Sequence, residues 1–89
     1  MKAYNIEVRG KVQGVYYRAS AKEKADALGV TGWCKNEPDG SVLLHIEGEE
    51  KAVKNMYNWC KHGPRFANPS STLRYETHVL GFEDFQIRK

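Results

Sequence analysis

Cysteine and histidine are scarce in this chain, and their spacing argues against a metal site. The 89 residues contain only two cysteines and three histidines, namely Cys34, Cys60, His45, His62 and His78. No Cys-x-x-Cys pair is present, and the histidines share no ligand spacing with the cysteines, so we expect no bound metal and no cofactor. Because two cysteines are also a weak signal for a disulfide, we expect free thiols.

Long apolar runs are missing as well. No stretch of the sequence is long enough to span a bilayer, and Met1 to Asn5 lack the apolar core of a signal peptide. There is also no internal repeat, low-complexity tract or inter-domain linker. We therefore expect one domain over residues 1–89, located in the cytoplasm and without a membrane partner.

The residues that are present suit a small folded domain. An apolar content of 40% with 11% aromatics favours a globular chain over a disordered one. The net charge of +3 favours anionic ligands in general, but it is too small to indicate nucleic acid by itself. A domain of this size buries only roughly 60–65% of its unfolded surface, so a thin core is expected.

The apolar pattern predicts five strands and two helices. Alternating apolar and polar side chains indicate strands over residues 3–8, 30–36, 41–47, 72–77 and 85–88. Apolar residues at helical spacing indicate helices over residues 19–28 and about 49–62. A turn that contains proline and glycine, residues 37–40, joins the second and third strands into a hairpin.

The order β-α-β-β-α-β, followed by a short C-terminal strand, predicts the class of fold. It is an α+β ferredoxin-like sandwich, an antiparallel sheet of four to five strands with both helices on one face. In this topology the first and second strands run in the same direction, with the third between them. Their C-terminal ends therefore lie at one edge of the sheet, roughly 10 Å apart, which Arg18 and Asn36 could bridge around a small anion.

The segment Gly10–Arg18 leaves the first strand and opens the first helix. Backbone N–H groups in such a turn, together with the positive end of the helix dipole, form an anion site. Arg18 adds a guanidinium that can bind two oxygens of one phosphate or carboxylate. Since a cation at a helix start opposes the dipole unless an anion is present, we predict a phosphate-binding loop.

Two motifs resemble those of the acylphosphatase family. The first is Gly10-x-Val12-Gln13-Gly14-Val15-x-Tyr17-Arg18. The second is Gly32-Trp33-Cys34-Lys35-Asn36-x-x-x-Gly40-x-Val42, followed by Gly48. The resemblance covers nearly the whole chain, as one acylphosphatase-like domain over residues 1–89. It implies metal-independent hydrolysis of the carboxyl–phosphate bond of acyl phosphates, which gives a carboxylate and inorganic phosphate.

The resemblance also implies a site with two parts. Arg18 binds the phosphoryl group and Asn36 orients the attacking water, and these are the two catalytic residues. The substrate-binding residues are those whose backbone N–H groups hold the phosphoryl oxygens, namely Gln13, Gly14, Val15, Tyr16, Tyr17 and Arg18. Neither arginine nor asparagine is a general base at neutral pH, so the substrate phosphate or bulk solvent is expected to take the proton.

Several neighbours of these residues are expected to be structural. We predict that the Gln13 side chain stabilises the loop and that Cys34 is a small buried thiol without a histidine partner. His45, on the third strand, is expected to be structural. The aromatic side chains of the two motifs are predicted to pack rather than to stack on a ligand, namely Tyr16, Tyr17 and Trp33.

One segment, Arg65–Ser71, departs from the family pattern. The family tends to read Gly-Pro-Pro-x-Ala-x-Val here, whereas this chain places Pro69 where an apolar residue would open the fourth strand. Proline lacks an N–H and is tolerated in sheets only at edges or strand starts. We therefore expect an edge strand with a late or irregular start.

Two other functions stay open on the same fold. An RNA-binding module shares the element order but requires exposed aromatic residues on its third strand, and Ser41–Glu47 contains none. A non-catalytic anion- or phosphate-binding domain is the second alternative. We expect a free-standing monomeric enzyme that acts on a small acyl phosphate, is inhibited by inorganic phosphate and binds no nucleic acid.

Overall fold

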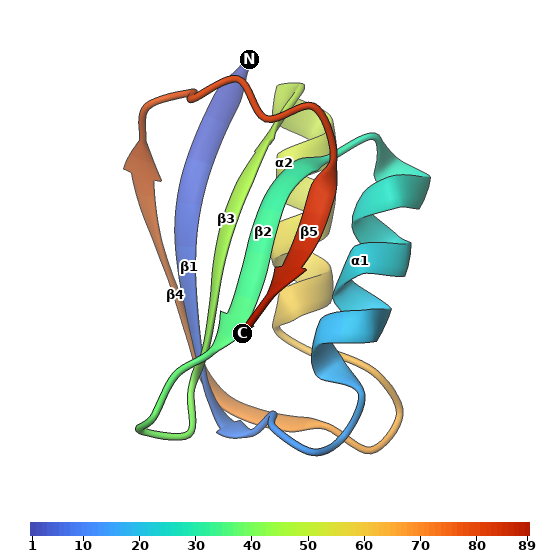
Figure 1. The fold of residues 1–89 in the computed structure, drawn as a ribbon, viewed down its shortest axis with the longest axis vertical. Coiled ribbons are helices and arrows are strands. Elements are labelled where there is room, and N and C mark those ends of the chain that lie inside the picture. The colour runs from blue at the N-terminus through green and yellow to red at the C-terminus, as the bar shows by residue number, and fades with distance from the viewer.

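A computed structural model describes residues 1–89 as five strands and two helices (Figure 1). In chain order these elements are β1 (Lys2–Lys11), α1 (Tyr17–Leu28), β2 (Thr31–Asn36), β3 (Val42–Gly48), α2 (Glu50–Cys60), β4 (Asn68–Thr77) and β5 (Phe85–Arg88). Neither helix is long and apolar enough to cross a membrane. All seven predicted elements are present, and their order is the predicted one.

The strands form one sheet in the order β4-β1-β3-β2-β5, and both helices cover the same face of it (Figure 1). β1 pairs antiparallel with β3 and with β4, and β2 pairs antiparallel with β3. The ferredoxin-like sandwich is thus confirmed. The sheet is not antiparallel throughout, however, because β5 pairs parallel with β2. After β4 the chain crosses to the opposite edge, and it enters that edge alongside β2.

The core lies between the sheet and the helices. Alternation places one face of β1 and β3 against the helices, with Ile6, Val8, Val42, Leu44 and Ile46 fully buried. α1 presents small alanines to the sheet, and α2 contributes Val53 and Met56. Burial of these side chains stabilises the fold at about 25 cal/mol per Å² of apolar surface removed from water.

The start of β4 differs from the prediction. The strand begins at Asn68 rather than at residue 72 and runs through Pro69, so the expectation of a late start is wrong. Its start is irregular, as expected, because Ser71 lies opposite Arg9 and Pro69 opposite Gly10, which leaves Ser70 as an extra bulged residue. β4 is an edge strand, and sheets tolerate proline at edges and bulges because only one side of the strand is paired.

Residues 78–84 carry the chain from β4 to β5 across one end of the sheet (Figure 1). The buried carboxylate of Glu47 holds this segment by accepting hydrogen bonds from the N–H groups of Leu80, Gly81 and Phe82. The His45 imidazole lies 2.7 Å from the same carboxylate and 2.9 Å from the amide oxygen of Asn5. His45 is therefore structural, as predicted.

Gly32 occupies a place in β2 that a larger residue cannot fill. Its φ is +132°, and a Cβ there would lie 1.8 Å from the carbonyl oxygen of His45. We expect Gly32→Ala to lower the free energy of unfolding by about 3 kcal/mol or more, because the neighbouring β3 backbone would have to move. Urea unfolding measures this loss.

Gly48→Ala is the matched control for Gly32→Ala. A Cβ at Gly48 would meet its nearest neighbours at 3.6 Å or more, which is ordinary contact. The control should therefore change the stability by less than about 1 kcal/mol. Equal losses in the two variants would contradict the close approach of β2 and β3 at Gly32.

Glu47 makes the fold sensitive to acid. Burial raises the pKa of its carboxyl group, but the hydrogen bonds from His45 and the three backbone N–H groups outweigh it and hold the pKa below the usual range. A group whose pKa is lowered by folding stabilises the fold above its unfolded pKa of about 4.3. This contribution disappears as the pH falls through the folded pKa.

We expect Glu47→Gln to lower the free energy of unfolding by about 1–3 kcal/mol at pH 7, since the amide NH₂ cannot accept the N–H bonds. The gap between wild type and variant should narrow as the pH falls below about 4.3, because the unfolded wild-type chain then binds a proton before the folded one does. Urea unfolding at a series of pH values tests this. Glu50→Gln, at an exposed position, is the control, and a gap that stays constant with pH would contradict the assignment.

Candidate active site

A pocket of about 340 Å³ opens where the phosphate-binding loop meets the end of β2. The C-terminal ends of β1, β2 and β5 lie at this end of the sheet, beside the first turn of α1 (Figure 1). The lining residues are Val12, Gly14, Tyr16, Tyr17, Arg18, Ala19, Asn36 and Ile87. The two predicted catalytic residues, Arg18 and Asn36, thus line one pocket.

The loop that leads into α1 offers a series of free backbone donors. None of the backbone N–H groups of residues 13–18 takes part in a backbone hydrogen bond, because the first turn of a helix has no partners for them. The residue before the helix, Tyr16, supplies no side-chain cap, and the first turn contains no acidic side chain. The positive end of the α1 dipole therefore faces the pocket without a protein anion to neutralise it.

Not every predicted binding residue lines the pocket through its side chain. Val15 is only 8% exposed and belongs to the hydrophobic core. Gln13 is also absent from the pocket lining, and its side chain points to the β2–β3 turn instead. For both residues the backbone N–H is the only group that the predicted role can use.

Arg18 is held in place by the C-terminal strand. It is the second residue of α1, and its Nη1 donates a hydrogen bond of 3.1 Å to the carbonyl oxygen of Arg88 at the end of β5. A guanidinium has five N–H donors, so the others stay available for an anion. Sequence reasoning predicted β5 but did not assign it to the site, since only the folded chain brings residue 88 beside residue 18.

Asn36 is the last residue of β2 and carries an unusual acceptor. Its Oδ1 is buried and accepts no hydrogen bond from the protein. Buried polar atoms in folded proteins almost always have partners, so an unpaired amide oxygen on a residue that lines a pocket is unusual. The side-chain amide can accept a hydrogen bond from a water and donate one to another group.

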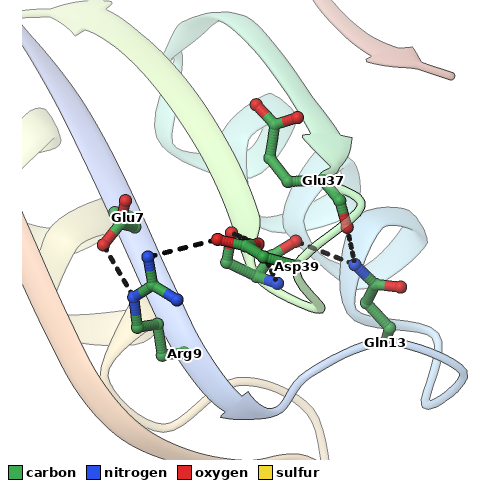
Figure 2. Close-up of polar contacts among 6 residues, drawn as sticks. Glu7, Arg9, Gln13, Glu37 and Asp39 are labelled. Carbon is green, nitrogen blue, oxygen red and sulfur yellow. Dashed lines mark hydrogen bonds and ion pairs between the residues drawn. The ribbon is translucent and has the colours of Figure 1, made fainter.

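Gln13 links the two halves of the site (Figure 2). Its Nε2 donates to the carbonyl oxygens of Glu37, at 2.8 Å, and Ser41, at 2.9 Å. These carbonyls belong to the turn that directly follows Asn36, so the bonds fix the end of β2 relative to the loop. The predicted loop-stabilising role of the Gln13 side chain is confirmed.

The same turn is attached to β1 on its other side (Figure 2). Arg9 Nη2 lies 3.2 Å from the carboxylate of Asp39, and Arg9 Nε lies 2.9 Å from that of Glu7. Hydrogen bonds from the hydroxyl and N–H of Ser41, followed by the charge of Arg9, lower the pKa of Asp39. These side chains are exposed, so solvent screens the ion pairs and they stabilise the turn only weakly.

The two thiols are free and buried. Burial raises the pKa of Cys34 to about 12, although the nearby charges of Arg18 and Lys22 lower it. Burial likewise raises the pKa of Cys60 to about 12. A thiol with such a pKa carries almost no thiolate at neutral pH and is not a nucleophile.

The aromatic residues of the two motifs divide into two groups. Tyr17 is buried, donates from its hydroxyl to the carbonyl of Cys60 and packs against Trp59. Trp33 stacks on His45 across the sheet. Tyr16 is 80% exposed, so the prediction that it packs is wrong. The left-handed backbone of Tyr16, just before α1, turns its side chain outward, and Tyr16 lines the pocket.

The structure is an α+β fold whose pocket is lined by free backbone N–H groups and by Arg18. A sequence model of a known family, described as Acylphosphatase, matches residues 4–87. The chain is 44% identical over 88 residues to an acylphosphatase of Methylococcus capsulatus, which covers 98% of this chain and 96% of that protein. It is 50% identical over 86 residues to an acylphosphatase of Nocardioides, with 97% and 87% covered.

A solved structure supports the same assignment. The crystal structure of the acylphosphatase from Bacillus subtilis superimposes on this fold with a TM-score of 0.97 and 33% sequence identity, and both chains are covered completely. This chain therefore belongs to the acylphosphatase family, a family of hydrolases. The resemblance seen in the two sequence motifs is confirmed.

The link through Gln13 can be tested without an activity assay. Gln13→Glu removes the NH₂ donor and places a carboxylate against two carbonyl oxygens. We expect a loss of about 2–3 kcal/mol in the free energy of unfolding. We also expect weaker binding of inorganic phosphate, because a negative charge then lies beside the loop. Urea unfolding and phosphate titration measure the two effects.

Gln86→Glu makes the same chemical change at an exposed position on β5, and it should leave the stability within about 0.5 kcal/mol of wild type. If Gln13→Glu were as stable as this control, the two hydrogen bonds would contribute nothing to the site.

Proposed function

We propose that this pocket hydrolyses the carboxyl–phosphate bond of acyl phosphates, with water as the nucleophile and without a metal ion. One observation carries the proposal. Residues with free backbone N–H groups, namely Gly14, Tyr16, Tyr17 and Arg18, line the same pocket as Asn36, whose amide oxygen has no hydrogen-bond partner. An anion-binding loop alone would only bind, whereas an acceptor that can orient a water beside it allows hydrolysis.

The phosphoryl group binds at the loop. Its oxygens accept hydrogen bonds from the backbone N–H groups of residues 13–18 and from the guanidinium of Arg18. During phosphoryl transfer, negative charge is spread over these oxygens and the leaving group, so fixed donors in this position stabilise the transition state. Arg18 contributes most when its planar guanidinium is aligned with two phosphoryl oxygens. The hydrogen bond to the Arg88 carbonyl favours this orientation.

The attacking water binds to Asn36. Its amide oxygen accepts a hydrogen bond from the water and directs the oxygen lone pair of the water at phosphorus, in line with the acyl oxygen. A new bond forms between the water oxygen and phosphorus, and the bond between phosphorus and the acyl oxygen breaks. The products are a carboxylate and inorganic phosphate. A carboxylate is a good leaving group, so no general acid is required.

The proton of the water passes to a phosphoryl oxygen or to solvent in this mechanism. Neither Arg18 nor Asn36 is a base at neutral pH, and the raised pKa of the buried Cys34 keeps its thiol protonated. The rate should therefore show no enzymic pKa near neutrality. The proposal includes the other expectations from the sequence, namely a cytoplasmic monomer that acts on small acyl phosphates and not on nucleic acid.

Two substitutions separate the roles of the catalytic residues. We expect Arg18→Ala to lower kcat/KM for acetyl phosphate by about a hundredfold or more, and to weaken competitive inhibition by inorganic phosphate. Arg18→Lys should also lose most activity, because an ammonium cannot bind two oxygens in a plane. Asn36→Ala should lower kcat by a comparable factor but leave the inhibition constant of phosphate nearly unchanged, since Asn36 contacts the water.

These rates are measured by release of phosphate in the presence of EDTA, with unfolding curves to show that each variant folds. Arg65→Ala and Asn55→Ala remove the same side chains at exposed positions outside the pocket, and they should retain wild-type rates. An inactive wild type would leave only a phosphate-binding protein. Activity that survives Asn36→Ala would overturn the role of the water.

A further inference from the structure

We infer that Tyr16 and Ile87 contact the acyl group of the substrate. This contact makes the pocket selective for acyl phosphates whose acyl group is an uncharged aromatic or branched apolar one. The assignment rests on the proposed function. In the proposed function the backbone N–H groups of the loop and Arg18 bind the phosphoryl group, and Asn36 binds the attacking water. The side chains of Tyr16 and Ile87 line the same pocket and have no part in that chemistry.

The volume of the pocket exceeds what a phosphoryl group requires. A water molecule takes up about 30 Å³ in the liquid, and a phosphoryl group displaces only a few waters. The pocket has a volume of about 340 Å³, which lies within the range of sites for small organic ligands, roughly 300–1,000 Å³. Most of this space is therefore left for the acyl group.

The exposed side chain of Tyr16 has no packing role in the fold. Its side chain is 80% exposed, and its ring forms no aromatic pair, cation–π contact or hydrogen bond within the protein. Its backbone has φ 62° and ψ 24°, and it is the only residue other than glycine with a positive φ. Such a conformation costs on the order of 1 kcal/mol, and strain of this kind is concentrated at ligand sites.

Ile87 supplies a second apolar surface from a different element. It lies on β5 and is 44% exposed, although it is opposite Cys34 and thus on the face that packs toward α1. A single exposed apolar residue is ordinary on a protein surface. Here an exposed ring and an exposed branched side chain line one pocket, and together they can enclose an apolar group.

The charges of the pocket indicate which acyl groups it accepts. Arg18 is the only charged residue in the lining, and its guanidinium binds the phosphoryl oxygens. An acyl group with a carboxylate or ammonium of its own would therefore lose water without gaining a partner. An uncharged aromatic ring can instead pack on Tyr16, in an arrangement that stabilises ring pairs by about 0.5–1.5 kcal/mol beyond burial.

The test compares benzoyl phosphate with acetyl phosphate in wild type, Tyr16→Ala and Tyr16→Phe. We expect Tyr16→Ala to raise KM for benzoyl phosphate and to lower its kcat/KM about tenfold more than that for acetyl phosphate. Tyr16→Phe keeps the ring and should retain the wild-type selectivity. Ile87→Ala should cause a smaller loss, about threefold, for benzoyl phosphate alone.

Tyr75→Ala is the matched control, since Tyr75 is 58% exposed on β4 and does not line the pocket. It should leave both substrates unaffected. Inhibition by inorganic phosphate, which has no acyl group, should be unchanged in Ile87→Ala. Equal losses for both substrates in Tyr16→Ala would show that Tyr16 shapes the loop, and weaker inhibition by phosphate in Ile87→Ala would refute its contact with the acyl group. No loss for either substrate would also overturn the acyl contact.

Binding of phosphonates separates this assignment from the proposed function. Phenylphosphonate and methylphosphonate carry the same anionic group and cannot be hydrolysed at an acyl bond. Calorimetric titration should show that wild type prefers the phenyl compound and that Tyr16→Ala loses this preference. Hydrolysis without the preference would refute the contact of Tyr16 alone, whereas the preference without hydrolysis would refute the proposed chemistry alone.

Discussion

The pairing of β3 with both β1 and β2 is the constraint on which the site depends. Because β3 is antiparallel to each of them, β1 and β2 must run in the same direction and end at the same edge of the sheet. The phosphate-binding loop follows one of these ends and Asn36 closes the other. Gln13 then bridges the remaining gap with two hydrogen bonds to the β2–β3 turn. The distance between the anion site and Asn36 is thus set by backbone pairing.

The pocket gathers polar and strained groups that a fold selected only for stability would avoid. Its loop N–H groups make no backbone hydrogen bond, the Asn36 amide oxygen has no partner, and Tyr16 adopts a left-handed backbone. Each of these costs free energy, of the order of 1–3 kcal/mol for an unpaired buried polar group. Packing elsewhere in the fold compensates for these costs. The hydrophobic core lies between the sheet and the helices, and the Glu47 carboxylate binds the segment that leads from β4 to β5.

Three predictions differed from the structure, each for a tertiary reason. β4 starts at Asn68 because a bulge at Ser70 accommodates Pro69 at the sheet edge, where Gly10 permits a close approach of the two backbones. β5 is parallel to β2 because the chain crosses from one edge of the sheet to the other. Tyr16 is exposed because its backbone turns out of the helical pattern one residue before α1 begins.

Local sequence by itself determined the elements and their order along the chain, because periodicity and turn residues act over a few positions. The two motifs with Arg18 and Asn36 came from the resemblance to the acylphosphatase family. Local sequence also determined that Gln13 would stabilise the loop and that His45 would be structural. Only the tertiary structure decided that the Arg88 carbonyl holds Arg18 and that Ile87 lines the pocket beside Tyr16. These contacts join residues about 70 positions apart in the chain. Such residues come together only when the whole sheet has formed, so no local sequence pattern predicts that they are in contact.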